Sequence, residues 1–144
     1  MAKAHICLIE DDDATRQTVR ELLEEEGYEV TEAPDGLAGW TLLNTSTQRM
    51  VVVLDHRLPA MDGCDLLELV AHDERLRDQH AYVFMTASPI AAQDDCESAI
   101  SDVNATVMAK PFNIDELVEA VHEAESLLRT PSSGSPANMP ETTQ

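Results

Sequence analysis

The chain has 144 residues, 43% of them hydrophobic, which suits one soluble domain with a single sizeable core. Its 28 acidic and 9 basic residues give a formal net charge of -19, and so acidic a surface repels the phosphates of DNA and RNA. The apolar runs are too short to cross a bilayer, and three aspartates follow the first run too soon for a signal peptide. We therefore expect a cytoplasmic protein with no direct nucleic-acid or membrane contact.

Five short runs with apolar character predict five strands along the chain. They lie within the segments "HICLIEDDD", "YEVTEA", "MVVVLD", "AYVFMTAS" and "ATVMAKP". Helical patterns lie between and after them, over residues 14–26, from Asp35, from Cys64 to about His72, over residues 89–100, and after Asn113. Asp12 or Asp13 is expected to cap the first helix, and Asn113 with Glu116 forms a capping-box pattern at the last one.

This alternation of strands and helices predicts a doubly wound α/β domain with a parallel sheet covered on both faces. The domain is expected to span residues 1–129. Residues 130–144 read "TPSSGSPANMPETTQ", which is rich in Pro, Ser and Thr and shows no periodicity. We expect a disordered tail or the stub of a linker there.

The three cysteines, Cys7, Cys64 and Cys96, lie far apart in the sequence, with no C-x-x-C pair and one left over. Neither a disulfide framework nor a zinc site is indicated by this spacing. We expect all three to be small core residues.

Unusual polar residues follow the predicted strands, and the carboxyl ends of parallel strands share one edge of the sheet. Each has an ordinary interpretation when taken singly, as a helix cap, a buried strand residue or a surface counter-ion. Together they predict a site in which three carboxylates repel one another. A divalent cation would relieve this repulsion, and oxygen ligands favour Mg²⁺. The residues are Glu10, Asp11, Asp55, Thr86 and Lys110.

Four motifs, "LIEDDD", "VVVLDHRLPAMDG", "FMTAS" and "AKPF", follow in order along the chain. Through these motifs the chain resembles the receiver domain of two-component response regulators. The resemblance extends from residue 4 to about residue 129. The resemblance implies a flavodoxin-like five-stranded parallel sheet in the order 2-1-3-4-5. It also implies that a histidine kinase or histidine phosphotransfer protein donates a phosphoryl group to an aspartate, and that the signal passes on through a contact with a further protein.

The resemblance also assigns roles to individual residues. Such a domain catalyses its own aspartyl phosphorylation and dephosphorylation without being a conventional enzyme. Asp55 would be the phosphoacceptor, Thr86 and Lys110 would contact the phosphoryl group, and Mg²⁺ would be held by Glu10, Asp11, Asp55 and the main-chain carbonyl of Arg57.

Some positions depart from the family pattern. Val107 stands where the family often has an aromatic switch residue, and Thr86 and Lys110 lie 24 positions apart, slightly more than is usual in the family. His56 follows Asp55 in an extended chain, so its side chain is expected to point away from Asp55.

Two other functions stay open. The first is a binding-only pseudo-receiver. The second is an aspartyl-phosphate phosphatase of the haloacid-dehalogenase type, which the arginine at position 57 disfavours because that class has a second aspartate there.

Overall fold

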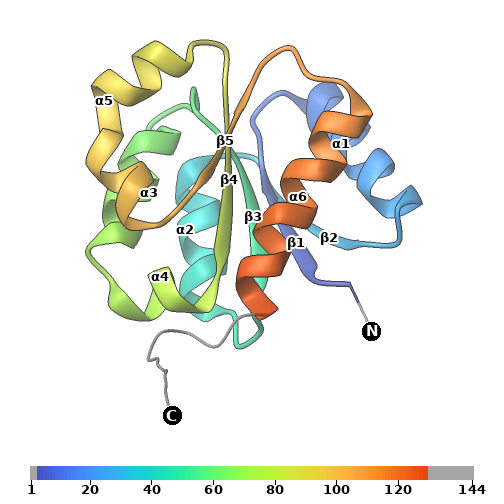
Figure 1. Ribbon diagram of the computed structural model, residues 1–144, viewed down its shortest axis with the longest axis horizontal. Coiled ribbons are helices and arrows are strands. Elements are labelled where there is room, and N and C mark those ends of the chain that lie inside the picture. Colours follow the sequence, from blue (N-terminus) through green and yellow to red (C-terminus); the bar gives the residue numbers. More distant parts are fainter. Residues whose placement is uncertain (1–2, 130–144) are drawn as a thin grey trace.

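The computed structural model describes residues 3–129, which form a five-stranded sheet in the order β2-β1-β3-β4-β5 (Figure 1). Every neighbouring pair of strands is parallel. The predicted doubly wound sheet and its strand order are therefore confirmed. The strands are β1 (His5–Ile9), β2 (Glu29–Ala33), β3 (Met50–Asp55), β4 (Ala81–Thr86) and β5 (Thr106–Ala109).

Within residues 3–129 six helices connect or follow these strands, and five of them lie where the sequence predicts a helix. The sixth, α4, was not predicted: it has 6 residues and buries only Leu76, too little for a repeating apolar stripe. The helices are α1 (Asp13–Glu25), α2 (Gly36–Thr45), α3 (Gly63–Ala71), α4 (Glu74–Gln79), α5 (Pro89–Asp102) and α6 (Ile114–Arg129).

Helices cover both faces of the sheet, with α2 to α5 on one side and α1 and α6 on the other (Figure 1). Alternate residues of β3 point into the two resulting cores: Val52 and Leu54 pack on the α2 to α5 side, whereas Val51 and Val53 pack on the other. All six residues of β3 are buried. The strand therefore runs through the middle of the domain and ends at Asp55, on the edge where the site was expected.

Local signals in the sequence fix several helix ends. Asp12 caps α1 by accepting a hydrogen bond from the Thr15 N–H at 2.8 Å. At the start of α6 the Asn113 side chain accepts the Glu116 N–H at 2.8 Å, and the Glu116 side chain accepts the Asn113 N–H at 2.9 Å. Both expected capping arrangements are confirmed.

All three cysteines are buried core residues, as predicted, but the expectation that no disulfide is indicated is wrong. Cys64 of α3 and Cys96 of α5 form a disulfide, with their Cα atoms 5.6 Å apart. The backbone of α5 leaves the helical conformation at Cys96, where φ is -153° and ψ is 42°. Among the described residues Cys7 is the free cysteine, and burial raises the pKa of its thiol to about 12.

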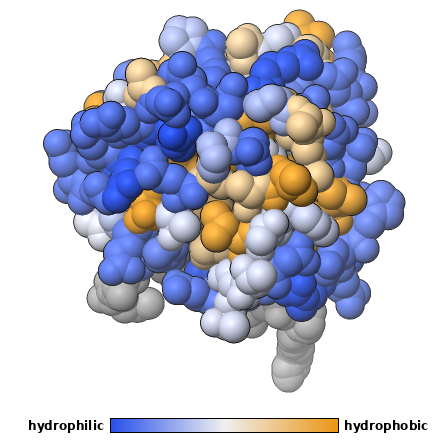
Figure 2. Space-filling view, turned by 180° about the vertical axis from the view of Figure 1, so that it is seen from behind, coloured by the Kyte–Doolittle hydropathy of each residue, from blue (hydrophilic) through white to orange (hydrophobic). Residues whose placement is uncertain are grey.

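The surface is mainly hydrophilic, with an apolar patch near the middle of the face shown in Figure 2. Within residues 3–129 no helix combines the length and the apolar character needed to cross a bilayer. The expected tail, residues 130–144, lies outside the described residues.

Candidate functional site

Three carboxylates from two neighbouring strands meet at the carboxyl edge of the sheet. Glu10 and Asp11 follow β1, and Asp55 is the last residue of β3. Each offers a carboxylate oxygen, and these oxygens all lie within 4.8 Å of one another. Glu10 and Asp55 are buried, whereas Asp11 is exposed. The site therefore opens to solvent on the side of Asp11.

Glu10 is held from several sides and still keeps one buried oxygen without a hydrogen bond. Its main-chain N–H donates to the carbonyl of Ala33 at 3.1 Å, and its Oε2 accepts the Asp12 N–H at 3.1 Å. Its Oε1 is buried and has no hydrogen-bond partner. Burial raises the pKa of Glu10, and the charge of Asp55 raises it further, against the opposing effects of the Asp12 N–H and Lys110. A carboxylate in this position is stabilised by any cation that reaches it.

Lys110 is a cation that already contacts two of these carboxylates. Its Nζ donates to Asp55 Oδ1 at 2.8 Å and lies 3.7 Å from Glu10 Oε1. Burial alone would lower the pKa of Lys110, but the hydrogen bond to Asp55 and the neighbouring carboxylates raise it above its usual value. Lys110 therefore stays charged at neutral pH and offsets part of the repulsion between the acids.

Thr86 ends β4, beside the end of β3, and its hydroxyl is already hydrogen-bonded. The hydroxyl donates to the carbonyl of Ser88 and accepts the Ser88 N–H, both at 3.1 Å. It also lies 2.8 Å from Nδ1 of His56. The carbonyl of Thr86 accepts the Lys110 N–H at 2.8 Å, which joins the end of β4 to the segment that carries Lys110.

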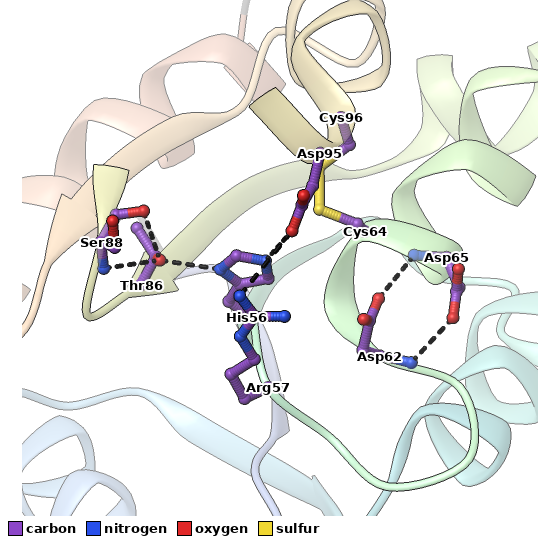
Figure 3. The surroundings of a disulfide bond; sticks show 9 residues. All are labelled: His56, Arg57, Asp62, Cys64, Asp65, Thr86, Ser88, Asp95 and Cys96. Atoms are coloured by element: carbon purple, nitrogen blue, oxygen red, sulfur yellow. Dashed lines mark hydrogen bonds and ion pairs between the residues drawn. A yellow bond between two sulfur atoms is a disulfide. The ribbon is translucent and has the colours of Figure 1, made fainter. Parts of the chain in front are cut away.

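The side chains of His56 and Arg57, which follow β3, contact residues other than Glu10, Asp11 and Asp55. The Arg57 side chain is 67% exposed and approaches Asp95 of α5 at 3.8 Å. His56 is buried and contacts Thr86 (Figure 3). Its ring also lies against the ring of Phe84, with the ring centroids 5.2 Å apart. The expectation that His56 points away from Asp55 agrees with these contacts.

Sequence reasoning missed the group of residues around His56. Cys64 and Cys96 lie 32 positions apart with no spacing motif that pairs them, and the sequence predicts no partner for His56. The signal that could have found this region is the extended spacing between Thr86 and Lys110, because those additional residues fall in the part of the chain that contains the broken helix α5.

Residues 6–122 match the family model of the response regulator receiver domain. The chain is 31% identical over 123 residues to sporulation initiation phosphotransferase F of Bacillus subtilis, covering 84% of this chain and 93% of that protein. It is 32% identical over 119 residues to the chemotaxis protein CheY of Pseudomonas aeruginosa, covering 82% and 93%.

Solved structures share the fold. One is the receiver domain of a Pseudomonas aeruginosa PAO1 sensor histidine kinase with a magnesium ion coordinated in its active site cleft. It superposes with a TM-score of 0.73 at 24% identity, covering 87% of this chain and 99% of that one. A receiver domain of a signal transduction histidine kinase from Syntrophus aciditrophicus superposes with a TM-score of 0.75 at 20% identity, covering 94% of this chain and 99% of that one. With the family match over residues 6–122, the chain belongs to the response regulator receiver domains of two-component systems.

Proposed function

We propose that this chain accepts a phosphoryl group on Asp55 from a phosphohistidine, with the help of Mg²⁺. One observation carries the proposal: buried Asp55 is hydrogen-bonded to Lys110 beside a buried oxygen of Glu10 that has no hydrogen-bond partner. The site thus combines a fixed carboxylate, a fixed cation and an unsatisfied ligand atom.

The donor set fits Mg²⁺. The ion takes oxygen ligands and is usually held in proteins by one or two carboxylates with several waters. Glu10, Asp11 and Asp55 would hold it, together with the main-chain carbonyl of Arg57, and the exposure of Asp11 leaves room for water. Bound there, Mg²⁺ would offset the repulsion among the acids and stabilise negative charge on the oxygens of the transferred group.

The reaction needs one nucleophile and a positively charged environment. A carboxylate oxygen of Asp55 forms a bond to phosphorus while the bond between phosphorus and the donor histidine nitrogen breaks. That nitrogen keeps the electron pair and takes up a proton from solvent. Lys110 then donates a hydrogen bond to a phosphoryl oxygen, and Thr86 does the same once its hydroxyl hydrogen turns away from the Ser88 carbonyl.

The relatives support a partner protein as the phosphoryl donor. One relative is named a sporulation initiation phosphotransferase, and one structural neighbour is the receiver domain of a sensor histidine kinase. We propose a histidine kinase or a histidine phosphotransfer protein as donor and a further protein as the target of the signal. We place the protein in the cytoplasm, with residues 1–129 as the receiver domain.

The alternatives lack such support. A binding-only pseudo-receiver would not need the Lys110 hydrogen bond to Asp55. A phosphatase of the haloacid-dehalogenase type would need a second aspartate at position 57, where Arg57 instead directs its side chain toward Asp95.

A small phosphodonor such as acetyl phosphate tests the proposal by intact-mass measurement. With Mg²⁺ the wild-type chain should gain the mass of one phosphoryl group, and Asp55→Asn should gain none because an amide is a poor nucleophile. The matched control is Asp115→Asn, an exposed acid in the first turn of α6, which should label like the wild type. The proposal would be overturned if Asp55→Asn gained as much phosphoryl mass as the wild type, or if the wild type gained the same mass without Mg²⁺.

A further inference from the structure

A second group of potential ligands lies between α3 and α5. A ring nitrogen of His56, Cys64 Sγ and a carboxylate oxygen of Asp95 lie within 4.8 Å of one another, and Cys96 Sγ is bonded to Cys64 Sγ (Figure 3). Three of these residues, His56, Cys64 and Cys96, are buried, and the Asp95 side chain is 45% exposed. A nitrogen, an oxygen and two sulfurs therefore meet at one place beneath the surface.

His56 presents an unpaired nitrogen to this group. The Thr86 hydroxyl donates its hydrogen to the Ser88 carbonyl, so the hydroxyl oxygen accepts a hydrogen bond from His56 Nδ1–H. In the neutral ring Nε2 then carries a lone pair, and it is buried without a hydrogen-bond partner. It faces Asp95 Oδ2 at 3.3 Å, a second group that can only accept when ionised. Two lone pairs at this distance repel each other unless a proton on Nε2 or another cation lies between them.

The break in α5 turns two adjacent residues toward the same point. Successive residues of a continuous α-helix point about 100° apart, whereas here Asp95 approaches His56 Nε2 at 3.3 Å and Cys96 is bonded to Cys64 in the same group. The φ of -153° and ψ of 42° at Cys96 remove that restriction. The four potential ligands are thus assembled by an irregularity in the chain.

The surroundings offer a route from solvent. A groove of about 530 Å³ runs along α5 beside Asp95 and Cys96. Acidic side chains line it, which attracts cations. They belong to Glu68, Asp94, Asp95, Glu97 and Asp102. Arg57 approaches Asp95 at 3.8 Å, on a side chain that is exposed enough to move away.

We propose that reduction of the Cys64–Cys96 disulfide turns this group into a binding site for a zinc-class divalent ion, ligated by His56, Asp95 and the two thiolates. Zinc prefers tetrahedral sites of sulfur, nitrogen and oxygen, and bonds of about 2.05 Å place neighbouring N and O ligands about 3.3 Å apart. The observed distance between Nε2 and Oδ2 is 3.3 Å. Thiolate and imidazole ligands disfavour Mg²⁺, so this site is separate from the one at Asp55.

The conversion is a two-electron reduction followed by exchange of protons for the metal. A phosphine reductant, with one water, becomes a phosphine oxide, and the S–S bond takes up two electrons and two protons to give two thiols. Binding of the ion then releases both thiol protons to solvent. Reducing compartments keep cysteines as thiols, so the form able to bind metal is the expected one in the proposed cytoplasmic setting.

Titration of the phosphine-reduced full chain with Co²⁺ tests the site. A thiolate-to-cobalt charge-transfer band and tetrahedral ligand-field bands should saturate at one Co²⁺ per chain and disappear when Zn²⁺ is added. The oxidised chain should show neither, and excess Mg²⁺ should not compete. Absence of the charge-transfer band in the reduced chain would overturn the proposal.

Variants separate this site from adventitious binding. Loss of even an outer-shell partner weakens metal sites about tenfold to hundredfold, so Asp95→Asn should weaken Co²⁺ binding at least that much. Asp95 is partly exposed, which makes the variant mild for folding. Neighbouring Asp94→Asn and buried Cys7→Ser are the matched controls and should bind as the wild type does. Unchanged affinity in Asp95→Asn, or loss of the band in Cys7→Ser, would refute the assigned ligands.

Discussion

Replacing Lys110 by Met removes the cation between two buried carboxylates while keeping a side chain of similar length. Lys110 Nζ lies 2.8 Å from Asp55 and 3.7 Å from Glu10, whose side chains are 7% and 2% exposed. Breaking a fully buried ion pair costs about 3 to 5 kcal/mol. Because the Lys110 side chain is 28% exposed, water screens part of this interaction, and we expect a loss of about 2 kcal/mol in the free energy of unfolding at pH 7.

Urea denaturation without divalent ions measures this loss. The matched control is Lys3→Met at the only other lysine, whose Nζ lies 4.8 Å from the centroid of the Tyr28 ring, and it should cost less than about 1 kcal/mol. Mg²⁺ should stabilise Lys110→Met more than the wild type, since the variant lacks the competing cation. A variant as stable as the wild type, with the same response to Mg²⁺, would refute the reasoning.

Three further predictions follow from the structure. Asp11→Asn should weaken Mg²⁺ binding roughly tenfold or more in a calorimetric titration, because a direct ligand is lost; unchanged affinity would contradict the ligand set. Burial lowers the pKa of His80 from 6.5 to about 4. Between pH 6.5 and pH 4 the unfolded chain therefore binds more protons than the folded chain. The free energy of unfolding should fall as the pH drops through this window, by up to roughly 3 kcal/mol. His80→Asn keeps an acceptor for the Met50 N–H and should flatten this dependence in urea denaturation; an identical slope would count against it. Gly63→Ala should cost roughly 1 to 3 kcal/mol, since its Cβ would lie 2.4 Å from the carbonyl oxygen of Asp55; equal stability in thermal melts would exclude that clash.

The sheet and the cluster of carboxylates at its edge could be predicted because short-range sequence patterns indicate both. The run from Met50 to Leu54 is apolar on both faces, which indicates a central parallel strand, and a charge directly after it must lie at the edge of the sheet. Since parallel strands end together, Glu10 and Asp55 could be placed side by side without any knowledge of helix packing.

The contacts around His56 could not be predicted because they depend on how two helices pack. Cys64 lies on α3 and Cys96 on α5, and their approach requires the irregular backbone at Cys96, which no residue type in that stretch demands. Helix α4 was missed for a related reason, since a single buried residue, Leu76, gives no periodicity.

The two outer strands of the sheet affect how the molecule behaves at high concentration. Strand β2 presents Glu29 and Glu32 at one margin, with arginines from α1 bonded to Glu32, so an incoming strand from a second molecule would have to strip water from these charges. At the other margin β5 has only four residues. Neither margin is a long apolar template, and with a net charge of -19 on each copy, edge-to-edge aggregation of the folded protein is disfavoured.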